Sequence, residues 1–480
     1  EDPVEGGDNL DFWSRDDAYA QVHNGNHGDA TDPFDGVRFD RFAWDTNPTF
    51  SAHMGFTRNL PLGVAVENIR RRGAVILVDV VRLELPGHIA KAFAVFSAQR
   101  PRPVHIAIPI DVMEMTVTED WSPQVVPNLP MPSGVSFSDA TALLASSQQT
   151  VMVVGGGCQR ASTEVTKLAE LLNVGVIASN AGKGVISDEN PLSLGGGIIS
   201  PAIQDYLAKA DVVLAIGTEL GEADSFIYDL PINGKVIRID IDSARFSDAF
   251  PADVAIYGDA RAACTKLIEA LESLEVVTAS LDAVSVLNSV REQQTSDYTE
   301  VERQHIKLLD ILRDELPDDG IIFGDIAQVV YTGTAAMKTW LPRTWFYPAG
   351  FGTLGCALPD AIGAKLALPN RKIVALVGDG GFMFTVNELA TAVEESLSIP
   401  IIIWHNHSYA MIRDGMVKRG IPEIGINPVA PNFEKLAAAF GCPGENVTNE
   451  SQFRESLNNA FNHDGPSVII VSENDRWLVG

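Results

Sequence analysis

Two short apolar runs that end in polar residues most constrain the fold of this chain. The first, residues 372–377, leads directly into the turn Gly378-Asp379-Gly380-Gly381, and the second, residues 399–404, ends just before Asn406. Continuous apolar runs of this length are typical of parallel strands that are covered on both faces. A capping-box pattern at residues 385–388 predicts that a helix begins between them. We therefore predict an α/β fold in which both runs are interior strands of one parallel sheet.

The polar residues that follow these strands predict a metal and phosphate site. The carboxyl ends of parallel strands meet at one edge of a sheet, where ligands of open α/β sheets bind. Asp379 and Asn406 should therefore lie close together, and oxygen donors of this kind suit Mg²⁺, which commonly also takes phosphate and water ligands. Gly380 and Gly381 allow backbone N–H groups to approach a phosphate. The alternative is that Asp379 is only a turn or helix-cap residue.

At these motifs the chain resembles the thiamine-diphosphate-dependent 2-oxo-acid decarboxylases and acetolactate synthases, whose signature is Gly-Asp-Gly followed by Asn-Asn. Residues 348–359 are similar to the family's cofactor-shaping segment, and residues 101–112 to the end of its pyrimidine-binding domain. The resemblance is continuous from about residue 85 to the C-terminus. The segments most similar to 5-guanidino-2-oxopentanoate decarboxylases are residues 94–96, 416–422 and 425–427.

The resemblance implies a set of metal ligands. These are Asp379, the side chain of Asn406 and the backbone carbonyl of Ser408. The first Asn of the usual pair is His405 in this chain. Because imidazole is a poor match for magnesium, we interpret His405 as a neighbouring polar residue rather than a ligand.

Further residues are implied to contact the cofactor. Gly380, Gly381 and Gln328 should face the diphosphate, although Gln328 could equally be a plain loop residue. Leu354 matches the bulky residue that wedges beneath the cofactor, and the carbonyl of Gly352 should hold its amino group. The alternative for Leu354 is ordinary core packing. Tyr409 is a candidate for lining the site, although an aromatic residue after a strand is more often a packing residue.

The length of 480 residues predicts more than one domain. We expect an irregular or truncated N-terminal region and two parallel-sheet domains of the thiamine-diphosphate enzyme type. The expected divisions are an unassigned, irregular region at 1–84, a remnant of the pyrimidine-binding domain at 85–125, a central Rossmann-like domain at 134–275 and a diphosphate-binding domain at 301–480. In the remnant we expect a helix around residues 89–96 and a strand at residues 104–108.

The central domain should hold a parallel sheet, since apolar runs at residues 150–154, 175–178, 212–216 and 236–240 alternate with helical patterns. The turn Gly155-Gly156-Gly157 after the first of these runs could cradle a nucleotide phosphate. A tight turn alone also explains the three glycines. In the resembling family this domain binds FAD or ADP in some members and nothing in others.

The sequence does not reveal a catalytic residue. The family uses a glutamate, usually in a His-Glu pair early in the chain, to drive activation of its cofactor, and no such pair precedes residue 85. Glu67 is the candidate considered, but it lacks the histidine and the small residues that follow. With most of the pyrimidine-binding domain unmatched, an apolar face on the other domains would be left uncovered.

Composition excludes several partners. The net charge of −28 argues against nucleic acid and anionic membranes, which both require basic patches. The four cysteines are scattered without a C-x-x-C pair and suggest buried thiols in a reducing compartment. No run is long enough to span a membrane and no signal-peptide pattern is present, so we expect a cytoplasmic location.

These observations lead to one preferred function and two alternatives. We expect thiamine-diphosphate- and magnesium-dependent, non-oxidative decarboxylation of a small-molecule 2-oxo acid, with 5-guanidino-2-oxopentanoate suggested as the substrate. Acetolactate synthase-type carboligation and a catalytically inactive, cofactor-binding paralogue are the alternatives. The resemblance also implies a homodimer or homotetramer.

Overall fold

The computed structural model describes residues 69–70, 73–74, 85–116, 122, 125–274, 282–473 and 475–479. The chain forms two compact units, Glu1–Leu129 and Pro130–Gly480. Most of the irregular region expected at 1–84, including Glu67, lies outside the described residues.

The described residues of the first unit form two very short strands and two helices. Strands β1 (Ile69–Arg70) and β2 (Gly73–Ala74) pair antiparallel. The expected helix is confirmed as α3 (Leu85–Ser97), and a single turn, α4 (Ile110–Met113), follows. The strand expected at residues 104–108 is wrong, since residues 101–109 form no regular element. Prolines 101, 103 and 109 surround this run and remove N–H donors that a strand ladder would need.

The second unit begins with a five-stranded parallel sheet, the central sheet. Its strands are β3 (Thr150–Val154), β4 (Gly175–Ala178), β5 (Val212–Ile216), β6 (Lys235–Asp240) and β7 (Val254–Tyr257), in the spatial order β4-β3-β5-β6-β7. Every residue of β3, β4 and β5 is buried, as expected for a sheet covered on both faces. The four strands predicted here are confirmed, and β7 is an additional edge strand.

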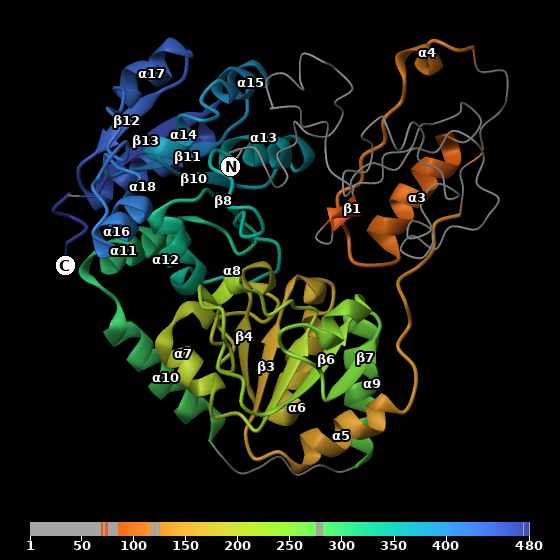
Figure 1. Cartoon of the computed structure of the whole chain (residues 1–480). Coiled ribbons are helices and arrows are strands. Elements are labelled where there is room, and N and C mark those ends of the chain that lie inside the picture. The colour runs from red at the N-terminus through yellow and green to blue at the C-terminus, as the bar shows by residue number, and fades with distance from the viewer. Residues whose placement is uncertain are drawn as a thin grey trace, which may run out of the picture. The chain divides into compact units, whose positions relative to one another are not determined.

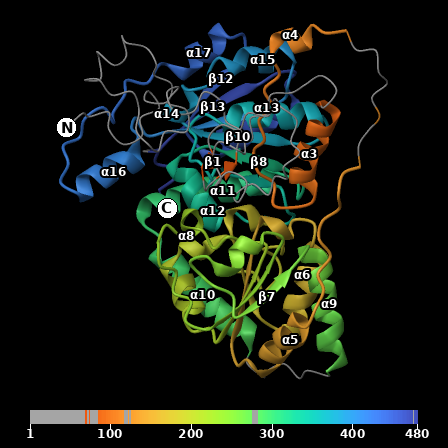
Figure 2. The same cartoon turned by 45° about the vertical axis from the view of Figure 1, so that its right-hand side comes forward.

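Helices cover both faces of the central sheet (Figures 1 and 2). One group consists of α5 (Ser136–Ser146), α6 (Ser162–Leu172) and α9 (Ala260–Ser273), in which α9 packs against both of the others. On the other side, α7 (Pro201–Leu207) packs against α10 (Ala283–Asp297), the helix that leads out of this domain. The single-turn helix α8 (Glu222–Ser225) follows β5.

A second parallel sheet of six strands, the C-terminal sheet, carries the motifs that opened the sequence analysis. Its strands are β8 (Ile321–Gly324), β9 (Trp345–Phe346), β10 (Ile373–Gly378), β11 (Pro400–His405), β12 (Gly444–Val447) and β13 (Ser467–Ser472). Their spatial order is β12-β13-β11-β10-β8-β9. The two apolar runs are thus the adjacent central strands β10 and β11, as predicted.

Side chains alternate between two separate cores on the two faces of this sheet. Val374, Leu376 and Trp404 join one core, which includes α11 (Glu300–Glu315), α12 (Gln328–Ala336) and α18 (Glu450–Asn462). Val377, Ile401 and Ile403 join the other, which includes α13 (Ala357–Ala367), α15 (Glu388–Glu394) and α17 (Phe433–Ala439). The predicted α/β class with parallel sheets is confirmed.

The capping box expected at residues 385–388 is wrong. Helix α15 begins at Glu388, and its N-cap Asn387 makes no side-chain capping bond. Thr385 instead donates its hydroxyl to the carbonyl oxygen of Gly355 at 2.7 Å. The hydroxyl of Thr385 therefore makes a tertiary hydrogen bond to Gly355 instead of capping the start of α15.

Lys183 joins the central sheet's domain to the C-terminal sheet's domain. Its ammonium group is buried and donates to the carbonyl oxygens of Thr334 at 3.0 Å and Met337 at 2.7 Å. Burial lowers the pKa of Lys183, and nearby Asp188 opposes that shift. Asp188 itself accepts from the backbone N–H of Thr339 at 2.8 Å, which makes a second polar link across the same joint.

Candidate active site

The parallel pairing of β10 and β11 brings the two predicted metal ligands to one edge of the sheet. Gly378 pairs with Trp404, so that Asp379 and Asn406 both follow the carboxyl ends of their strands. Asp379 opens the short helix α14 (Asp379–Phe382) and is only 5% exposed. Asp379 and Asn406 therefore lie at the same edge of the sheet, as the order of the strands predicted.

Three donors hold the carboxylate of Asp379. Oδ1 accepts from the N–H of Gly380 at 2.7 Å, and Oδ2 accepts from the N–H of His407 at 2.7 Å. Nδ1 of His405 lies 2.9 Å from Oδ2. His407 reaches this position with φ of 59°, in the left-handed region that few non-glycine residues adopt. Such backbone conformations concentrate at functional sites.

Asn406, Ser408 and Gln328 form a second group beside Asp379. The amide nitrogen of Asn406 donates to Oε1 of Gln328 at 3.2 Å, and its Oδ1 accepts from the N–H of Ser408 at 3.2 Å. Ser408 is buried, and its hydroxyl donates to the carbonyl of Ile426 at 3.1 Å. The structure thus gathers the predicted metal ligands and the predicted diphosphate residue Gln328 in one place.

The glycines of the turn are required by close neighbours. A Cβ on Gly380 would collide with the ring of Tyr409, and a Cβ on Gly381 would collide with Oδ2 of Asp325. Tyr409 therefore packs against the turn, and its N–H donates to the carbonyl of Ile426 at 2.8 Å. Tyr409 and Asp325 therefore leave no room for a side chain at Gly380 or Gly381.

Asp325 is a site residue that the sequence reasoning did not single out. It follows β8, is fully buried, and accepts from the N–H of Ile326 at 2.8 Å and the N–H of Gly355 at 2.9 Å. Burial raises the pKa of this carboxyl, and the two N–H donors oppose that shift. The available signal was its position at the end of an apolar strand next to β10.

Asp325 fixes the segment that carries the predicted wedge residue. Gly352 and Gly355 adopt φ of 65° and 83°, which only glycine adopts readily. Between them, the side chain of Leu354 lies next to Gly381, within van der Waals reach of a Cβ built there. Leu354 is partly exposed rather than a member of either core cluster. Leu354 is therefore not an ordinary core residue, and its wedge role stays a prediction.

The donors at this edge fit a magnesium ion with a diphosphate. A carboxylate, a side-chain amide and a backbone carbonyl offer hard oxygen atoms, which Mg²⁺ prefers. No group of three or more His, Cys, Asp or Glu side chains suited to a metal occurs in the part of the chain that the structure describes. The sequence suggested that His405 is a polar neighbour of the motif and not a ligand, and the structure places its ring in direct contact with Asp379.

The carboxyl edge of the central sheet does not fit a nucleotide phosphate. The N–H groups of Gly155 and Gly157 already donate to the carbonyls of Ile216 at 2.9 Å and Gly217 at 3.0 Å. Both glycines allow the turn to approach β5 and its exit closely, because a Cβ on either would meet Gly217. The tight-turn explanation therefore accounts for these glycines.

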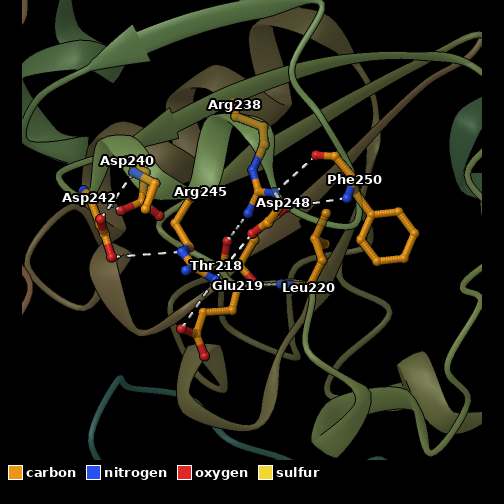
Figure 3. A network of polar contacts seen from close by, with 10 residues as sticks. Thr218, Glu219, Leu220, Arg238, Asp240, Asp242, Arg245, Asp248 and Phe250 are labelled. Atoms are coloured by element: carbon orange, nitrogen blue, oxygen red, sulfur yellow. Dashed lines mark hydrogen bonds and ion pairs between the residues drawn. The ribbon is translucent and has the colours of Figure 1, made fainter. Parts of the chain in front are cut away.

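Beside this turn, charged side chains form a network of hydrogen bonds and ion pairs (Figure 3). The buried guanidinium of Arg238 donates to Oδ1 of Asp248 at 2.7 Å and to the carbonyls of Phe250 at 3.0 Å and Thr218 at 2.8 Å. Arg245 pairs with Asp248 at 3.1 Å. The remaining carboxylates of the network are Glu219, Asp240 and Asp242. Four carboxylates around two guanidinium groups would repel a phosphate.

Comparison with known proteins identifies the family. A model described as "Thiamine pyrophosphate enzyme, C-terminal TPP binding domain" matches residues 325–471, and one for the central domain of the same enzymes matches residues 137–267. The chain belongs to the thiamine pyrophosphate enzymes. Thiamine diphosphate is accordingly its cofactor, and the matched C-terminal segment contains Asp379, Asn406 and Ser408.

Individual relatives cover most of this thiamine pyrophosphate enzyme. The probable 2-ketoarginine decarboxylase of Pseudomonas aeruginosa is 36% identical over 389 residues, which are 80% of this chain and 69% of that protein. The probable acetolactate synthase large subunit of Methanococcus aeolicus is 30% identical over 418 residues, with 80% and 69% covered. The large subunit of acetolactate synthase isozyme 1 of Escherichia coli is 28% identical over 413 residues, with 81% and 70% covered.

Large apolar side chains surround the thiamine pyrophosphate motifs. Phe351, next to the wedge segment, is 96% exposed, and Phe384 after the Gly-Asp-Gly turn is 58% exposed. On α16 (Ala410–Lys418), Met411 and Ile412 are also about half exposed. These residues agree with the apolar face predicted for the C-terminal domain.

Two smaller expectations can also be compared with the structure. Cys158, Cys264 and Cys442 are buried and Cys356 is partly buried, and all four are free thiols, as expected. None of the helices in the described ranges has the length and apolar character needed to cross a membrane.

Proposed function

We propose that the chain catalyses thiamine-diphosphate- and magnesium-dependent, non-oxidative decarboxylation of a 2-oxo acid. The observation that carries this proposal is the gathering of Asp379, Asn406 and Ser408 at the ends of β10 and β11. Oxygen donors in this arrangement suit the metal that anchors a diphosphate. Gly381 would then present its N–H group to the diphosphate, while the N–H of Gly380, which donates to Oδ1 of Asp379, would hold that carboxylate in place.

Each neighbouring residue has a defined task in this proposal. When bound, thiamine diphosphate supplies a carbon nucleophile that adds to the 2-oxo group and accepts the electrons released as CO₂ departs. Leu354 would support the cofactor from below, and Asp325 would keep the segment from Gly352 to Gly355 in position. Tyr409 would limit access of water above the turn.

The substrate that we propose is 5-guanidino-2-oxopentanoate. Its support is the relative that is named as a probable 2-ketoarginine decarboxylase, the same compound under another name. The second candidate, acetolactate synthase-type carboligation, is supported by the relatives that carry that name. The domain divisions 85–125, 134–275 and 301–480 also remain proposals, as does a cytoplasmic homodimer or homotetramer whose contacts would cover Phe351 and Phe384.

The test measures cofactor binding and turnover in the same sample. Calorimetry with thiamine diphosphate should show binding that requires Mg²⁺, and CO₂ release should be faster from 5-guanidino-2-oxopentanoate than from pyruvate. Acetolactate formed from pyruvate at a higher rate would select carboligation instead. Binding without any turnover would identify an inactive, cofactor-binding paralogue, and absence of binding would refute the proposed site.

A further inference from the structure

A cavity of about 520 Å³ lies beside the candidate active site, within the second unit. Its walls come from the start of α7, the junction of α10 and α11, helix α12 and the first turns of α16. Gln328 contributes to the wall, whereas Asp379, Asn406 and Ser408 do not. The cavity is therefore a neighbour of the diphosphate site and not a part of it.

Three buried polar side-chain atoms, each from a residue of the cavity wall, lack a hydrogen-bond partner among the residues that the structure describes. The atoms are Oγ of Ser200, Nε2 of Gln294 and Nε2 of His305. Each of these residues is more than nine-tenths buried. Leaving such an atom unsatisfied costs about 1–3 kcal/mol. An occupant that donates hydrogen bonds would satisfy Oγ of Ser200, and also Nε2 of His305 when the proton of the ring is on Nδ1, which lies 2.8 Å from the hydroxyl of Thr332.

Carboxylates dominate the charge of the cavity. Asp297, Glu302, Asp414 and Glu473 contribute to the wall, and the one cationic side chain among its described lining residues is Arg413. Arg413 is already paired with Asp414 at 2.9 Å, which leaves three carboxylates without a cation in the wall. His305 does not alter this balance, because burial lowers its pKa to about 3 and keeps the ring neutral.

Glu473 has the best position to receive a cation. It is partly buried, and its Oε2 accepts from Nε1 of Trp404 at 3.0 Å. This bond orients the carboxylate while leaving Oε1 with acceptor capacity for an occupant. A partly desolvated carboxylate attracts a cation more strongly than one in bulk water.

Aromatic rings complete the wall. Phe226 and Tyr331 meet edge to face with their centroids 5.7 Å apart, and both contribute to the cavity. A planar, weakly hydrated guanidinium group stacks on such rings and offers five N–H donors to surrounding carboxylates. An ammonium group lacks the planar face and is more strongly hydrated.

From the unsatisfied Oγ of Ser200 and Nε2 of His305, the excess of carboxylates and the aromatic wall, we propose that this cavity binds a small guanidinium compound. Gln328 connects this cavity to the diphosphate site by hydrogen bonds. Nε2 of Gln328 donates to Oδ2 of Asp414 at 3.1 Å, and Oε1 of Gln328 accepts from Asn406 at 3.2 Å. An occupant that contacts Gln328 is therefore one hydrogen bond away from Asn406.

The test titrates butylguanidinium into the full chain by calorimetry at low ionic strength. Butylguanidinium should bind, and added salt should weaken the binding. The uncharged isostere butylurea should bind at least about tenfold more weakly, and butylammonium should also be weaker. Equal binding of butylurea, equal binding of butylammonium or no measurable binding of butylguanidinium would each overturn the proposal.

Variants locate the binding in the cavity. Glu473→Gln, which keeps an oxygen for Trp404, and Asp297→Asn should each weaken butylguanidinium binding by about fivefold. The matched control Glu455→Gln changes an exposed carboxylate on α18 and should have no effect. Asp379→Ala should retain the binding, which separates this cavity from the proposed active site. Unchanged affinity in both Glu473→Gln and Asp297→Asn, or loss in Asp379→Ala, would refute the assignment.

Discussion

Nδ1 of His405 lies 2.9 Å from Oδ2 of Asp379, so that an imidazole on β11 contacts the carboxylate that follows β10. The N–H of His407 donates to the same oxygen at 2.7 Å. These two donors fix the orientation of the carboxylate from the end of the neighbouring strand. Preorganised donors of this kind reduce the cost of ordering a ligand when the metal binds.

Replacement of Asp379 should abolish magnesium-dependent binding of thiamine diphosphate. Asp379→Ala removes the one carboxylate of the proposed metal ligands, and the neutral oxygens that remain would hold a hydrated Mg²⁺ poorly. Calorimetry with and without Mg²⁺ measures the effect. The control is Asp464→Ala, which changes an exposed aspartate before β13. If Asp379→Ala binds the cofactor like the unchanged chain, the assignment of the metal site is wrong.

His405 should act as a positioning residue for Asp379. His405→Leu removes the donor to Oδ2, and loss of one hydrogen bond to a charged group should weaken magnesium-dependent cofactor binding by about tenfold. His405→Asn restores a side-chain amide donor and should recover most of the affinity. His463→Leu, on an exposed histidine, is the control. A general loss of packing would instead lower the affinity in both His405 variants.

The joint made by Lys183 should contribute measurably to stability. Lys183→Met keeps the length of the side chain but leaves the carbonyls of Thr334 and Met337 without this donor. A loss of about 2 kcal/mol is expected, which lowers the midpoint of thermal unfolding by several degrees. Lys209→Met, on an exposed lysine, should change the midpoint little. An unaltered midpoint in Lys183→Met would show that water replaces the lost donor.

The sequence predicted those strands whose side chains are buried on both faces. Residues 150–154 and 212–216 are continuous apolar runs because helices cover both sides of the central sheet. Among the strands of the two parallel sheets, those that were not predicted are β7, β9 and β12. Strand β9 has only two residues, and β12 exposes Glu445 and Asn446 at the edge of its sheet, so neither leaves an apolar run in the sequence.

The site could be predicted as far as strand order determines it. Asp379 and Asn406 come together because their strands are adjacent and parallel, which the apolar runs reveal. The contact between His405 and Asp379 depends on a side-chain rotamer and on the left-handed conformation of His407. Neither is encoded in a pattern that can be read along the chain. The hydroxyl of Thr385 shows the same limit, since a distant carbonyl competes for it.

The central domain should bind neither FAD nor ADP. Its glycine turn uses two N–H groups internally, and the carboxylates of the Arg238 network oppose a phosphate. Titration with FAD or ADP should give no heat of binding, and protein purified from cells should lack flavin absorbance near 450 nm. Stoichiometric flavin released on denaturation would contradict this prediction.

Acid should destabilise the chain partly through His305. Burial lowers the pKa of His305 from 6.5 to about 3. The folded state therefore keeps the ring neutral, while the unfolded state takes up a proton below pH 6.5, so that the stabilising contribution is complete above pH 6.5 and is lost as the pH falls toward 3. At pH 5 the loss should be roughly 2 kcal/mol. The variant His305→Gln has no titratable side chain at this position. Between pH 7 and pH 5, the free energy of unfolding of this variant, measured with denaturant, should therefore fall by roughly 2 kcal/mol less than that of the unchanged chain. Equal losses in the two proteins would show that His305 is protonated in the folded state.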